Sequence, residues 1–487
     1  MRPITVHELT KWISGRLLRG QKLSTITGVT TDSRTVKPGD LFIPLVGERF
    51  DGHDFVRTAL SGGAVATLVE ENRAGGIMDG FAKGSYPDTE FSVIGVQDTL
   101  LALQDLARAY RNLFDLPIIA VTGSTGKTTT KDMIASICSQ MGPVLKSPEN
   151  FNNEIGLPLT LLQLDHEHLY GVVEMGMRGR GQIRELTRIA SPQVGLVTNV
   201  GVVHMELLGT QEAIAEAKAE LLEDMAPGSV AILNADDDLV RQMAHSCQDI
   251  DVIFYGYRKP RPTTPTGSRY VTATNIVARG ALGVRFQIHY DGDRVDIDLP
   301  LPGAYQVHNA LAAAAAAFAV GASPWHVQSG LSKAQLSSMR MEQIQLTGGG
   351  LIINDAYNAN PTSMAAALEV AHEIAAGRPL VFILGDMLEL GHLSKEAHYQ
   401  IGRQVASYGP RFLIAVGNWA QEIARGARNA GMAGDLIVEC WDQTVAQSVV
   451  GELVQSGDVV LVKGSRGIAL EHVVEVLRTQ FGSMGRG

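Results

Sequence analysis

A short glycine loop followed by a lysine and a threonine is the part of this chain that points most directly to chemistry. Two residues separate Gly123 from Gly126, and Lys127 and Thr128 follow at once. Glycines permit a tight turn whose backbone N–H groups point inward, and the start of a following helix adds positive charge. The lysine can reach the outer phosphates of a nucleotide, and the threonine hydroxyl can bind Mg²⁺. The loop therefore predicts a nucleotide phosphate site. The residues assigned to it are Thr122, Gly123, Ser124, Thr125, Gly126, Lys127, Thr128 and Thr129.

The segments on either side of the loop support this interpretation. Residues 116–121 form an apolar run with strand character, and residues 131–138 have helical spacing. Strand, glycine loop and helix in this order are typical of a phosphate cradle. The common form of such a loop has four residues between its glycines, which would place the first glycine at Val121. The alternative interpretation is an ordinary glycine turn with a surface lysine.

Further candidate residues follow the next predicted strands. Glu174 ends the apolar run 171–173, and a carboxylate at that place can hold Mg²⁺ beside the loop. His204 follows a predicted strand over 194–199, and Lys218 lies in a helical segment. From spacing alone, a structural role is favoured for His204 and a solvated helix face for Lys218.

Three polar, glycine-bearing segments follow strands in the last third of the chain. Asp355 to Pro361 follows a strand over 351–355, and residues 385–391 and 463–466 follow two further strands. The carboxyl ends of parallel strands meet at one edge of a sheet, where ligands bind. We therefore expect one ligand-facing edge here, the alternative being ordinary Asn/Pro turns.

Composition excludes several classes of protein. The net charge is −10 and no long basic run is present, which argues against a nucleic-acid groove. An anionic nucleotide must then meet a local cationic site. Three distant cysteines favour reduced thiols and a cytoplasmic protein. The longest apolar stretch, residues 310–322, is too short to span a bilayer and predicts a buried helix instead.

The order of predicted elements indicates an α/β protein with parallel sheets. Apolar strand-like runs alternate with helical patterns through most of the chain, and residues 270–301 alternate like antiparallel strands. A strand is also expected over residues 40–46 and an amphipathic helix over 100–114. We divide the 487 residues into domains at 1–108, 109–334 and 335–487.

Taken together, these motifs resemble the Mur ligase family of ATP-dependent amide-forming enzymes. The glycine loop has that family's short spacing, and four more segments match in the same order. They are residues 152–162, 355–364, 384–391 and 462–466. The resemblance covers essentially the whole chain. It implies a three-domain Mur ligase architecture, with a small N-terminal α/β domain, a central P-loop parallel-sheet ATPase domain and a C-terminal Rossmann-like domain.

The resemblance implies roles for individual residues. Lys127, His204 and Lys218 would be catalytic, with Lys218 a candidate for the carbamate that family members carry on a lysine. The metal site, for two Mg²⁺ ions, would comprise Thr128, Glu174, His204 and Lys218. ATP would contact Asn309, Arg340 and Asp355 besides the loop. Substrate would contact Asp32, Ser33, Arg34, Asn152, Asn153, Tyr357, Asn358 and Asn360. The segment Asp51 to His53 resembles part of the uridine nucleotide site.

The implied activity is the ATP-dependent addition of D-alanyl-D-alanine to UDP-N-acetylmuramoyl-tripeptide through an acyl phosphate, in peptidoglycan precursor synthesis. The N-terminal domain would bind the UDP substrate, and the C-terminal domain would bind the dipeptide and close on ATP. A cytoplasmic monomer without nucleic-acid partners is the expectation. The family often has His-Asn where this chain has Tyr305-Gln306, and Asp-Asp-Ser-Tyr where it has residues 354–357.

Two alternatives remain open at this point. One is another member of the same family, such as the ligase that adds the third amino acid or a folate polyglutamylating enzyme. The Asp-Asn-Pro-Arg motif of the diaminopimelate-adding ligase is absent from the sequence, and the folate enzymes have a different turn at 355–361. The other alternative is a nucleotide-dependent switch, which the phosphate loop alone does not exclude.

Overall fold

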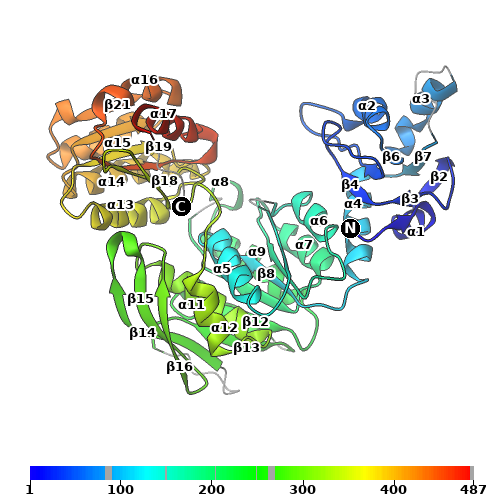
Figure 1. Cartoon of the computed structure of the whole chain (residues 1–487), viewed down its shortest axis with the longest axis horizontal. Coiled ribbons are helices and arrows are strands. Elements are labelled where there is room, and N and C mark those ends of the chain that lie inside the picture. The colour runs from blue at the N-terminus through cyan, green and yellow to red at the C-terminus, as the bar shows by residue number, and fades with distance from the viewer. Residues whose placement is uncertain (83–89, 149–150, 203–204, 248, 261–268, 483–487) are drawn as a thin grey trace.

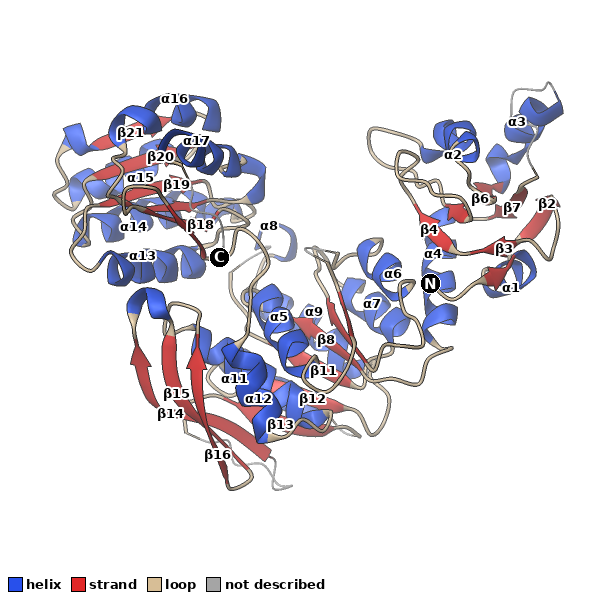
Figure 2. Cartoon of the chain, in the orientation of Figure 1, coloured by secondary structure: helices blue, strands red, loops and turns tan. Residues whose placement is uncertain are grey.

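The chain folds around three main β-sheets that follow one another in an arc (Figure 1). The computed structural model describes residues 1–82, 90–148, 151–202, 205–247, 249–260 and 269–482. The N-terminal unit lies at one end of the arc and the C-terminal sheet at the other, with the central sheet between them. Figure 2 shows helices against the sheets of all three units, as expected for an α/β protein.

The N-terminal unit contains a five-stranded sheet in the order β2-β7-β6-β5-β4. Its strands are β2 (Arg16–Arg19), β4 (Gly28–Thr30), β5 (Asp40–Phe42), β6 (Ala66–Glu70) and β7 (Ser92–Val96). A two-stranded sheet joins β1 (Ile4–Thr5) to β3 (Thr25–Ile26). The helices are α1 (Val6–Trp12), α2 (Val56–Ser61) and α3 (Glu71–Ala82). The strand predicted over residues 40–46 is shorter than expected, because Pro44 has no N–H to donate to a neighbouring strand.

The central sheet has nine strands in the order β16-β15-β14-β13-β12-β11-β8-β10-β9. The parallel part comprises β8 (Ile118–Thr122), β9 (Val144–Lys146), β10 (Tyr170–Glu174), β11 (Val194–Val197), β12 (Val230–Asn234) and β13 (Asp251–Tyr255). The antiparallel extension is β14 (Arg269–Ala278), β15 (Val284–Tyr290) and β16 (Asp293–Leu299). This confirms the mixed sheet that the sequence pattern predicted. The strand order reverses at β8, so the glycine loop that follows β8 lies at the point where open α/β sheets bind ligands.

Helices cover both faces of the central sheet and bury two separate apolar cores. One face carries α4 (Thr99–Arg111), α6 (Gly156–Leu161), α7 (Gln182–Ala190) and α9 (Gln211–Glu223). The other carries α5 (Lys127–Cys138), α11 (Gln306–Ala319) and α12 (Pro324–Ser332). Two short helices, α8 (Met205–Leu208) and α10 (Asp238–Gln242), lie in connections. The alanine-rich stretch forms the buried α11, whose small side chains let it pack closely on α5.

Within the described residues, no helix has the length and apolar character needed to cross a bilayer. The alanine-rich helix α11 spans 14 residues, whereas a bilayer requires about 20.

The C-terminal sheet has six strands in the order β17-β18-β22-β19-β20-β21. Its strands are β17 (Glu342–Gln345), β18 (Leu351–Asp355), β19 (Leu380–Gly385), β20 (Phe412–Val416), β21 (Ile437–Cys440) and β22 (Val459–Lys463). Its helices are α13 (Pro361–Ala375), α14 (Ser394–Ser407), α15 (Ala420–Asn429), α16 (Gln443–Leu453) and α17 (Glu471–Phe481). Strands β18 and β22 are parallel neighbours that pair Asp355 with Lys463, so both side chains leave the sheet at one edge.

Helix α4 connects the N-terminal unit to the central sheet, and its last residue anchors it there. The Arg111 guanidinium is buried and donates to the carbonyl oxygens of Ala190 at 3.0 Å and Leu116 at 3.1 Å. A third hydrogen bond, 2.7 Å long, reaches the carbonyl oxygen of Phe114. One side chain thus satisfies three backbone acceptors, where the end of α7 meets the connection between α4 and β8.

We predict that Arg111→Ala lowers the free energy of unfolding by about 2–4 kcal/mol, because several buried carbonyl groups lose their donor. Urea denaturation followed by circular dichroism measures the change. Arg108→Ala is the matched control on the same helix, where an exposed ion pair with Asp105 contributes less than about 1 kcal/mol. Equal destabilisation by the two variants would contradict the anchoring role of Arg111.

Candidate active site

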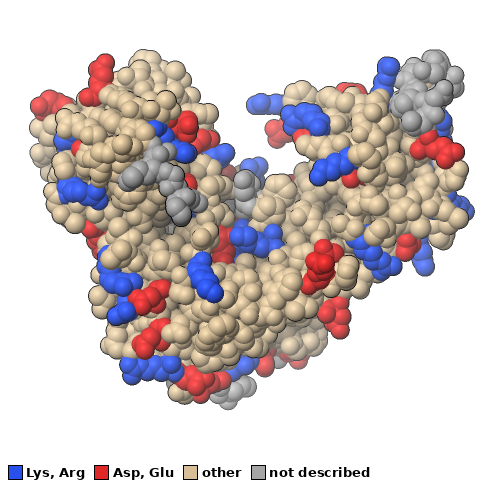
Figure 3. Space-filling model, in the orientation of Figure 1, with Lys and Arg blue, Asp and Glu red and all other residues tan. Residues whose placement is uncertain are grey.

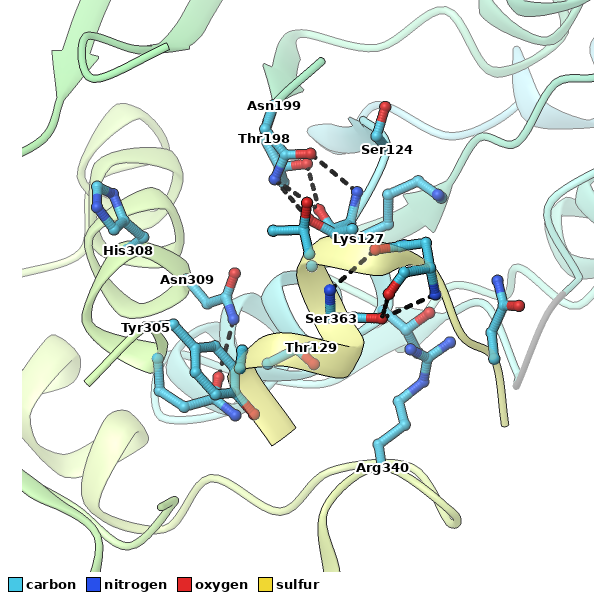
Figure 4. A pocket seen from close by; sticks show the side chains of 18 of the residues that line it. Ser124, Lys127, Thr129, Thr198, Asn199, Tyr305, His308, Asn309, Arg340 and Ser363 are labelled. Carbon is cyan, nitrogen blue, oxygen red and sulfur yellow. Dashed lines mark hydrogen bonds between the residues drawn. The ribbon is translucent and has the colours of Figure 1, made fainter. Parts of the chain in front are cut away.

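A cavity of about 460 Å³ lies between the carboxyl ends of the central strands and the edge of the C-terminal sheet. Most of the residues predicted for ATP line it, together with several predicted for the substrate or the metal, although they come from distant parts of the chain. Thr122 and Gly123 of the predicted nucleotide set do not line it. Those from the central unit are Ser124, Thr125, Gly126, Lys127, Thr128, Thr129, Asn152, Glu174 and Asn309. Those from the C-terminal part are Arg340, Asp355, Tyr357, Asn358 and Asn360. Figure 4 shows side chains from both parts converging on the loop.

The phosphate loop is fixed by close packing that excludes side chains at both glycines. Gly123 has a φ of 145°, and a Cβ there would lie 1.8 Å from Thr198 Oγ1. Gly126 has a φ of 78°, and a Cβ there would lie 2.5 Å from Asn309 Oδ1. The short loop therefore uses each glycine for a left-handed backbone and for a close approach by a neighbouring side chain.

Residues after strand β11 hold the middle of the loop from the side. Asn199 Oδ1 accepts from the Thr125 N–H at 2.9 Å, and Asn199 Nδ2 donates to Thr125 Oγ1 at 2.8 Å. Thr198 Oγ1 donates to the Thr125 carbonyl oxygen at 2.6 Å. These contacts appear at the top of Figure 4. The loop is therefore held in its turned shape by the protein itself.

Lys127 supplies a half-buried positive charge at the start of α5. Its Nζ donates to the Gly123 carbonyl oxygen at 2.8 Å, so the side chain folds back over the loop. Burial lowers the pKa of Lys127, while the Glu174 carboxylate works in the opposite direction. An ammonium group in such a place gains strongly from an anionic ligand, because little water is present to screen the charge.

Thr128 and Glu174 form a buried pair that fits a divalent cation. Thr128 Oγ1 donates to Glu174 Oε2 at 2.6 Å, and Asn152 Nδ2 donates to Glu174 Oε1 at 2.8 Å. Glu174 is 2% exposed, and no Lys, Arg or His side chain among the described residues forms an ion pair with it. A buried carboxylate next to a hydroxyl is a donor set that Mg²⁺ accepts.

The other predicted metal residues lie apart from this pair or outside the described part of the chain. Lys218 is in α9, is 2% exposed and does not line the cavity. Burial, together with the nearby Lys127 charge, lowers its pKa well below the usual value. His204 lies outside the described residues. Within those residues, no three His, Cys, Asp or Glu side chains cluster as metal ligands do.

The opposite wall of the cavity belongs to the C-terminal sheet and the segment before it. The Arg340 guanidinium stacks on the Tyr357 ring at 4.2 Å, and its buried Nε has no hydrogen-bond partner. Asp355 Oδ2 accepts from Lys463 Nζ at 2.6 Å, and the same ammonium donates to the Asn358 carbonyl oxygen at 2.9 Å. Figure 4 shows Arg340 pointing from its loop into the cavity. An anion is the natural partner for the unsatisfied guanidinium.

Asn309 lies at the start of α11, where this chain has the unusual pair Tyr305-Gln306. Asn309 Nδ2 donates to Gln306 Oε1 at 2.8 Å, and its Oδ1 faces Gly126. Tyr305 packs against the core of the C-terminal unit. Tyr305 and Gln306, the pair at which this chain departs from the family pattern, thus both lie in the wall of the cavity, and Gln306 orients Asn309 there.

Sequence reasoning missed several residues of the cavity. Asp236 follows β12 and accepts from the backbone N–H groups of Tyr257 at 2.9 Å and Lys259 at 2.6 Å. His308 lies tilted against the Tyr257 ring, with the ring centroids 4.5 Å apart. The position of Asp236 at the carboxyl end of a parallel strand is a signal that could have identified it.

Some predicted substrate residues lie away from the cavity. Asp32, Ser33 and Arg34 belong to the N-terminal unit, where Arg34 Nη2 pairs with Asp32 at 2.7 Å and lowers the pKa of that carboxyl to about 2. The Asn153 side chain accepts from the Gly156 N–H at 2.9 Å, just before α6. His53 is buried between Asp51 and the Glu70 N–H, which gives its ring a structural role.

The surface view shows a broad recess between the N-terminal and C-terminal units (Figure 3). Lys and Arg side chains lie on the N-terminal rim of this recess and over its floor. A local concentration of positive charge on a chain of net charge −10 agrees with the expectation of an anionic substrate.

Comparison with known proteins gives matches along the whole chain. Residues 25–111 match the model "Mur ligase family, catalytic domain", residues 121–317 the Mur ligase middle domain, and residues 339–466 the model "Mur ligase, glutamate ligase domain". The UDP-N-acetylmuramoyl-tripeptide–D-alanyl-D-alanine ligase of Bacillus subtilis is 37% identical over 474 residues, which cover 97% of this chain and 98% of that protein.

Solved structures agree with this match. MurF from Acinetobacter baumannii is 32% identical and has a TM-score of 0.85, covering 98% of this chain and 99% of its own. MurF ligase from Thermotoga maritima, in complex with ADP, is 25% identical and has a TM-score of 0.75, covering 93% of this chain and 97% of its own.

We predict that the folded protein loses stability in mild acid because of His308. Burial lowers the pKa of His308 from 6.5 to about 4, although the Asp236 carboxylate, 3.5 Å from Nε2, favours the protonated form. Between these values the unfolded chain binds a proton that the folded chain does not, so stability falls as the pH drops. From pH 7 to pH 5 this group alone should lower the free energy of unfolding by about 2 kcal/mol.

Urea denaturation of wild type and His308→Gln at both pH values measures this contribution. The variant should lose about 2 kcal/mol less than wild type over the same interval. His392→Gln, which changes an exposed histidine, should follow wild type. The same pH dependence for wild type and His308→Gln would refute the assignment.

Proposed function

The chain belongs to the Mur ligase family, and we propose that the cavity between its central and C-terminal sheets is where it performs the family reaction. The protein is an ATP-dependent ligase that adds D-alanyl-D-alanine to UDP-N-acetylmuramoyl-tripeptide, forming an amide bond. The observation that carries the proposal is that one cavity combines the phosphate loop with the 355–360 segment, far apart in the sequence. The match to relatives of this activity over 97% of the chain supports it.

The reaction requires activation of a carboxylate, which is a poor electrophile at neutral pH. Transfer of the γ-phosphoryl group of ATP to a carboxylate oxygen forms an acyl phosphate and releases ADP. The amine of D-alanyl-D-alanine then attacks the acyl carbon, the C–O bond to phosphate breaks, and the amine loses a proton. The products are the pentapeptide, ADP and inorganic phosphate.

The residues of the cavity meet the electrostatic demands of the first step, in which two anions approach each other. Lys127 and Arg340 both line the cavity and carry positive charge, and both would contact phosphate oxygens. The backbone N–H groups of the loop add fixed dipoles. Asp355, which forms an ion pair with Lys463, would accept hydrogen bonds from the nucleotide ribose.

Thr128 and Glu174 would hold one Mg²⁺, and His204 with Lys218 would contribute to a second metal site. When bound, Mg²⁺ neutralises charge on the phosphates. Burial lowers the pKa of Lys218 well below its usual value, which favours the neutral amine that reacts with carbon dioxide to form a carbamate. That group would be an anionic metal ligand in place of a buried cation.

The three parts of the chain divide the substrates between them. Residues 1–108, with Asp32, Ser33 and Arg34, would bind the UDP part, and residues 109–334 would bind ATP. Residues 335–487, with Tyr357, Asn358 and Asn360, would bind the dipeptide. Asn152 and Asn153 would face the peptide of the UDP substrate. Closure of the parts around the recess would exclude water from the acyl phosphate. We also propose that the protein is cytoplasmic and monomeric. Its free cysteines support the cytoplasmic setting.

An omission assay tests this function directly. The protein is incubated with ATP, Mg²⁺, UDP-N-acetylmuramoyl-tripeptide and D-alanyl-D-alanine, and each component is omitted in turn. Mass spectrometry should detect the pentapeptide in the complete mixture alone, with one phosphate released for each product. Rapid phosphate release without the dipeptide or the tripeptide would instead indicate a nucleotide switch.

Lys127→Ala should reduce turnover at least about a thousandfold, because the Lys127 ammonium stabilises charge that develops in phosphoryl transfer. The thermal unfolding temperature should stay near that of wild type. Lys333→Ala, an exposed lysine at the end of α12, is the matched control and should retain full activity. Retained turnover in Lys127→Ala would contradict the role of Lys127 in phosphoryl transfer.

Lys218 carbamylation has a spectroscopic signature that does not depend on activity. Incubation with ¹³C-bicarbonate should give a carbamate carbonyl signal in the ¹³C spectrum of wild type, because burial lowers the pKa of the Lys218 amine and favours its neutral form. Lys218→Arg should lack this signal, whereas Lys333→Ala should keep it. Identical spectra for wild type and Lys218→Arg would exclude the carbamate.

A further inference from the structure

The segment between α12 and β17, residues 333–341, joins the central unit to the C-terminal sheet and carries Arg340. We call it the linker. Two bulky residues next to Arg340 adopt left-handed backbone conformations, Met339 with a φ of 57° and Met341 with a φ of 51°. Such conformations are costly for side chains of this size and persist where the surrounding structure imposes them. The turn that presents Arg340 to the cavity must therefore be held from outside.

Hydrogen bonds from the C-terminal sheet hold one end of this turn. The Met341 N–H donates to Asp355 Oδ1 at 3.0 Å, and the Met339 N–H donates to Glu342 Oε2 at 3.1 Å. Both acceptors belong to residues of β17 and β18. These bonds fix Arg340 relative to the C-terminal unit. Its position relative to the phosphate loop depends on another contact.

That contact comes from α5, the helix that begins at the phosphate loop. Asp132 Oδ2 accepts from the Ser337 N–H at 2.8 Å and from Ser337 Oγ at 2.7 Å. Ser337 lies three residues before Arg340 in the linker, and Asp132 lies five residues after Lys127 in α5. A single carboxylate oxygen thus connects the rigid element under the loop to the segment that carries Arg340.

The Asp132 carboxylate is placed to make this connection strong. Its side chain is fully buried, and its other oxygen lies 3.1 Å from Lys146 Nζ and 3.6 Å from Lys131 Nζ. Hydrogen bonds to an ionised acceptor are stronger than neutral ones. Neither Asp132 nor Ser337 lines the cavity, so neither is placed to contact a ligand there.

We infer that Asp132 and Ser337 are positioning residues for nucleotide binding, acting through Arg340. They fix the linker against α5, so that the guanidinium is already aimed at the phosphate loop before a nucleotide arrives. Preorganisation of this kind lowers the ordering cost of binding. The inference rests on the proposed function, because it assumes that the cavity binds ATP.

Ser337→Ala is the most direct variant, because it removes the Oγ hydrogen bond and keeps the backbone one. Its KM for ATP and its Kd for ADP, measured by calorimetry, should both rise about fivefold. The KM of the dipeptide should stay within about twofold of wild type. Ser337→Thr keeps the hydroxyl and should restore most of the lost affinity.

Ser329→Ala is the matched control. Its hydroxyl donates to Gln140 Oε1 at 3.0 Å and so also joins α12 to the end of the α5 region, without a connection to Arg340. Its affinity for ADP should equal that of wild type. A rise in Kd as large as that of Ser337→Ala would show a general packing effect and overturn the inference.

A double variant tests whether Ser337 acts through Arg340. Arg340→Ala removes the side chain that Ser337 positions, so adding Ser337→Ala should change the Kd for ADP by less than about twofold. Independent, multiplying effects would overturn the inference, as would an unchanged Kd in the single variant Ser337→Ala. The proposed function fails separately, when wild type binds ADP but forms no pentapeptide, since the Kd comparison does not require turnover.

Discussion

The approach of two side chains to the glycines of the phosphate loop is the constraint on which the rest of the site depends. Thr198 fills the space that a Cβ at Gly123 would need, and Asn309 does the same at Gly126. Thr198 follows the neighbouring strand β11, and Asn309 lies in the first turn of helix α11. The loop can therefore be short, because strand ends and a helix start supply the rigidity that a longer loop would need to provide. Lys127 and Thr128 then begin α5 at a defined place.

Around the loop, some charged side chains of the cavity are paired with protein partners and others are not. Glu174 accepts hydrogen bonds from Thr128 and Asn152, while Asp355 is paired with Lys463. Lys127 and Arg340 keep donor capacity that the protein does not satisfy with a carboxylate contact. This pattern is costly in an empty protein, since buried charge is poorly solvated, and it becomes favourable when phosphates and Mg²⁺ enter together.

The sequence was sufficient for the features that depend on local pattern. Apolar runs bounded by glycine and polar residues identified β8, β10 and β18, and the polar residues after them lie in the cavity as the rule for parallel strands predicts. The pairing of β22 between β18 and β19 could not be predicted, since register depends on which apolar faces meet. The hydrogen bond between Asp132 and Ser337 joins residues 205 positions apart and leaves no periodic signal. The strand predicted over residues 40–46 is longer than the observed one, because the prediction followed the apolar character of the segment and did not account for the missing N–H donor of Pro44.

The central claim is that the cavity between the two sheets activates a carboxylate by phosphoryl transfer before the amine attacks. The most direct measurement uses UDP-N-acetylmuramoyl-tripeptide whose reacting carboxylate carries ¹⁸O, with ATP and D-alanyl-D-alanine, and follows the mass of the released phosphate. The account predicts one ¹⁸O atom in each phosphate formed with the pentapeptide, because the oxygen that bridges carbon and phosphorus leaves with phosphate. Release of phosphate without the label, while the pentapeptide accumulates, would contradict it.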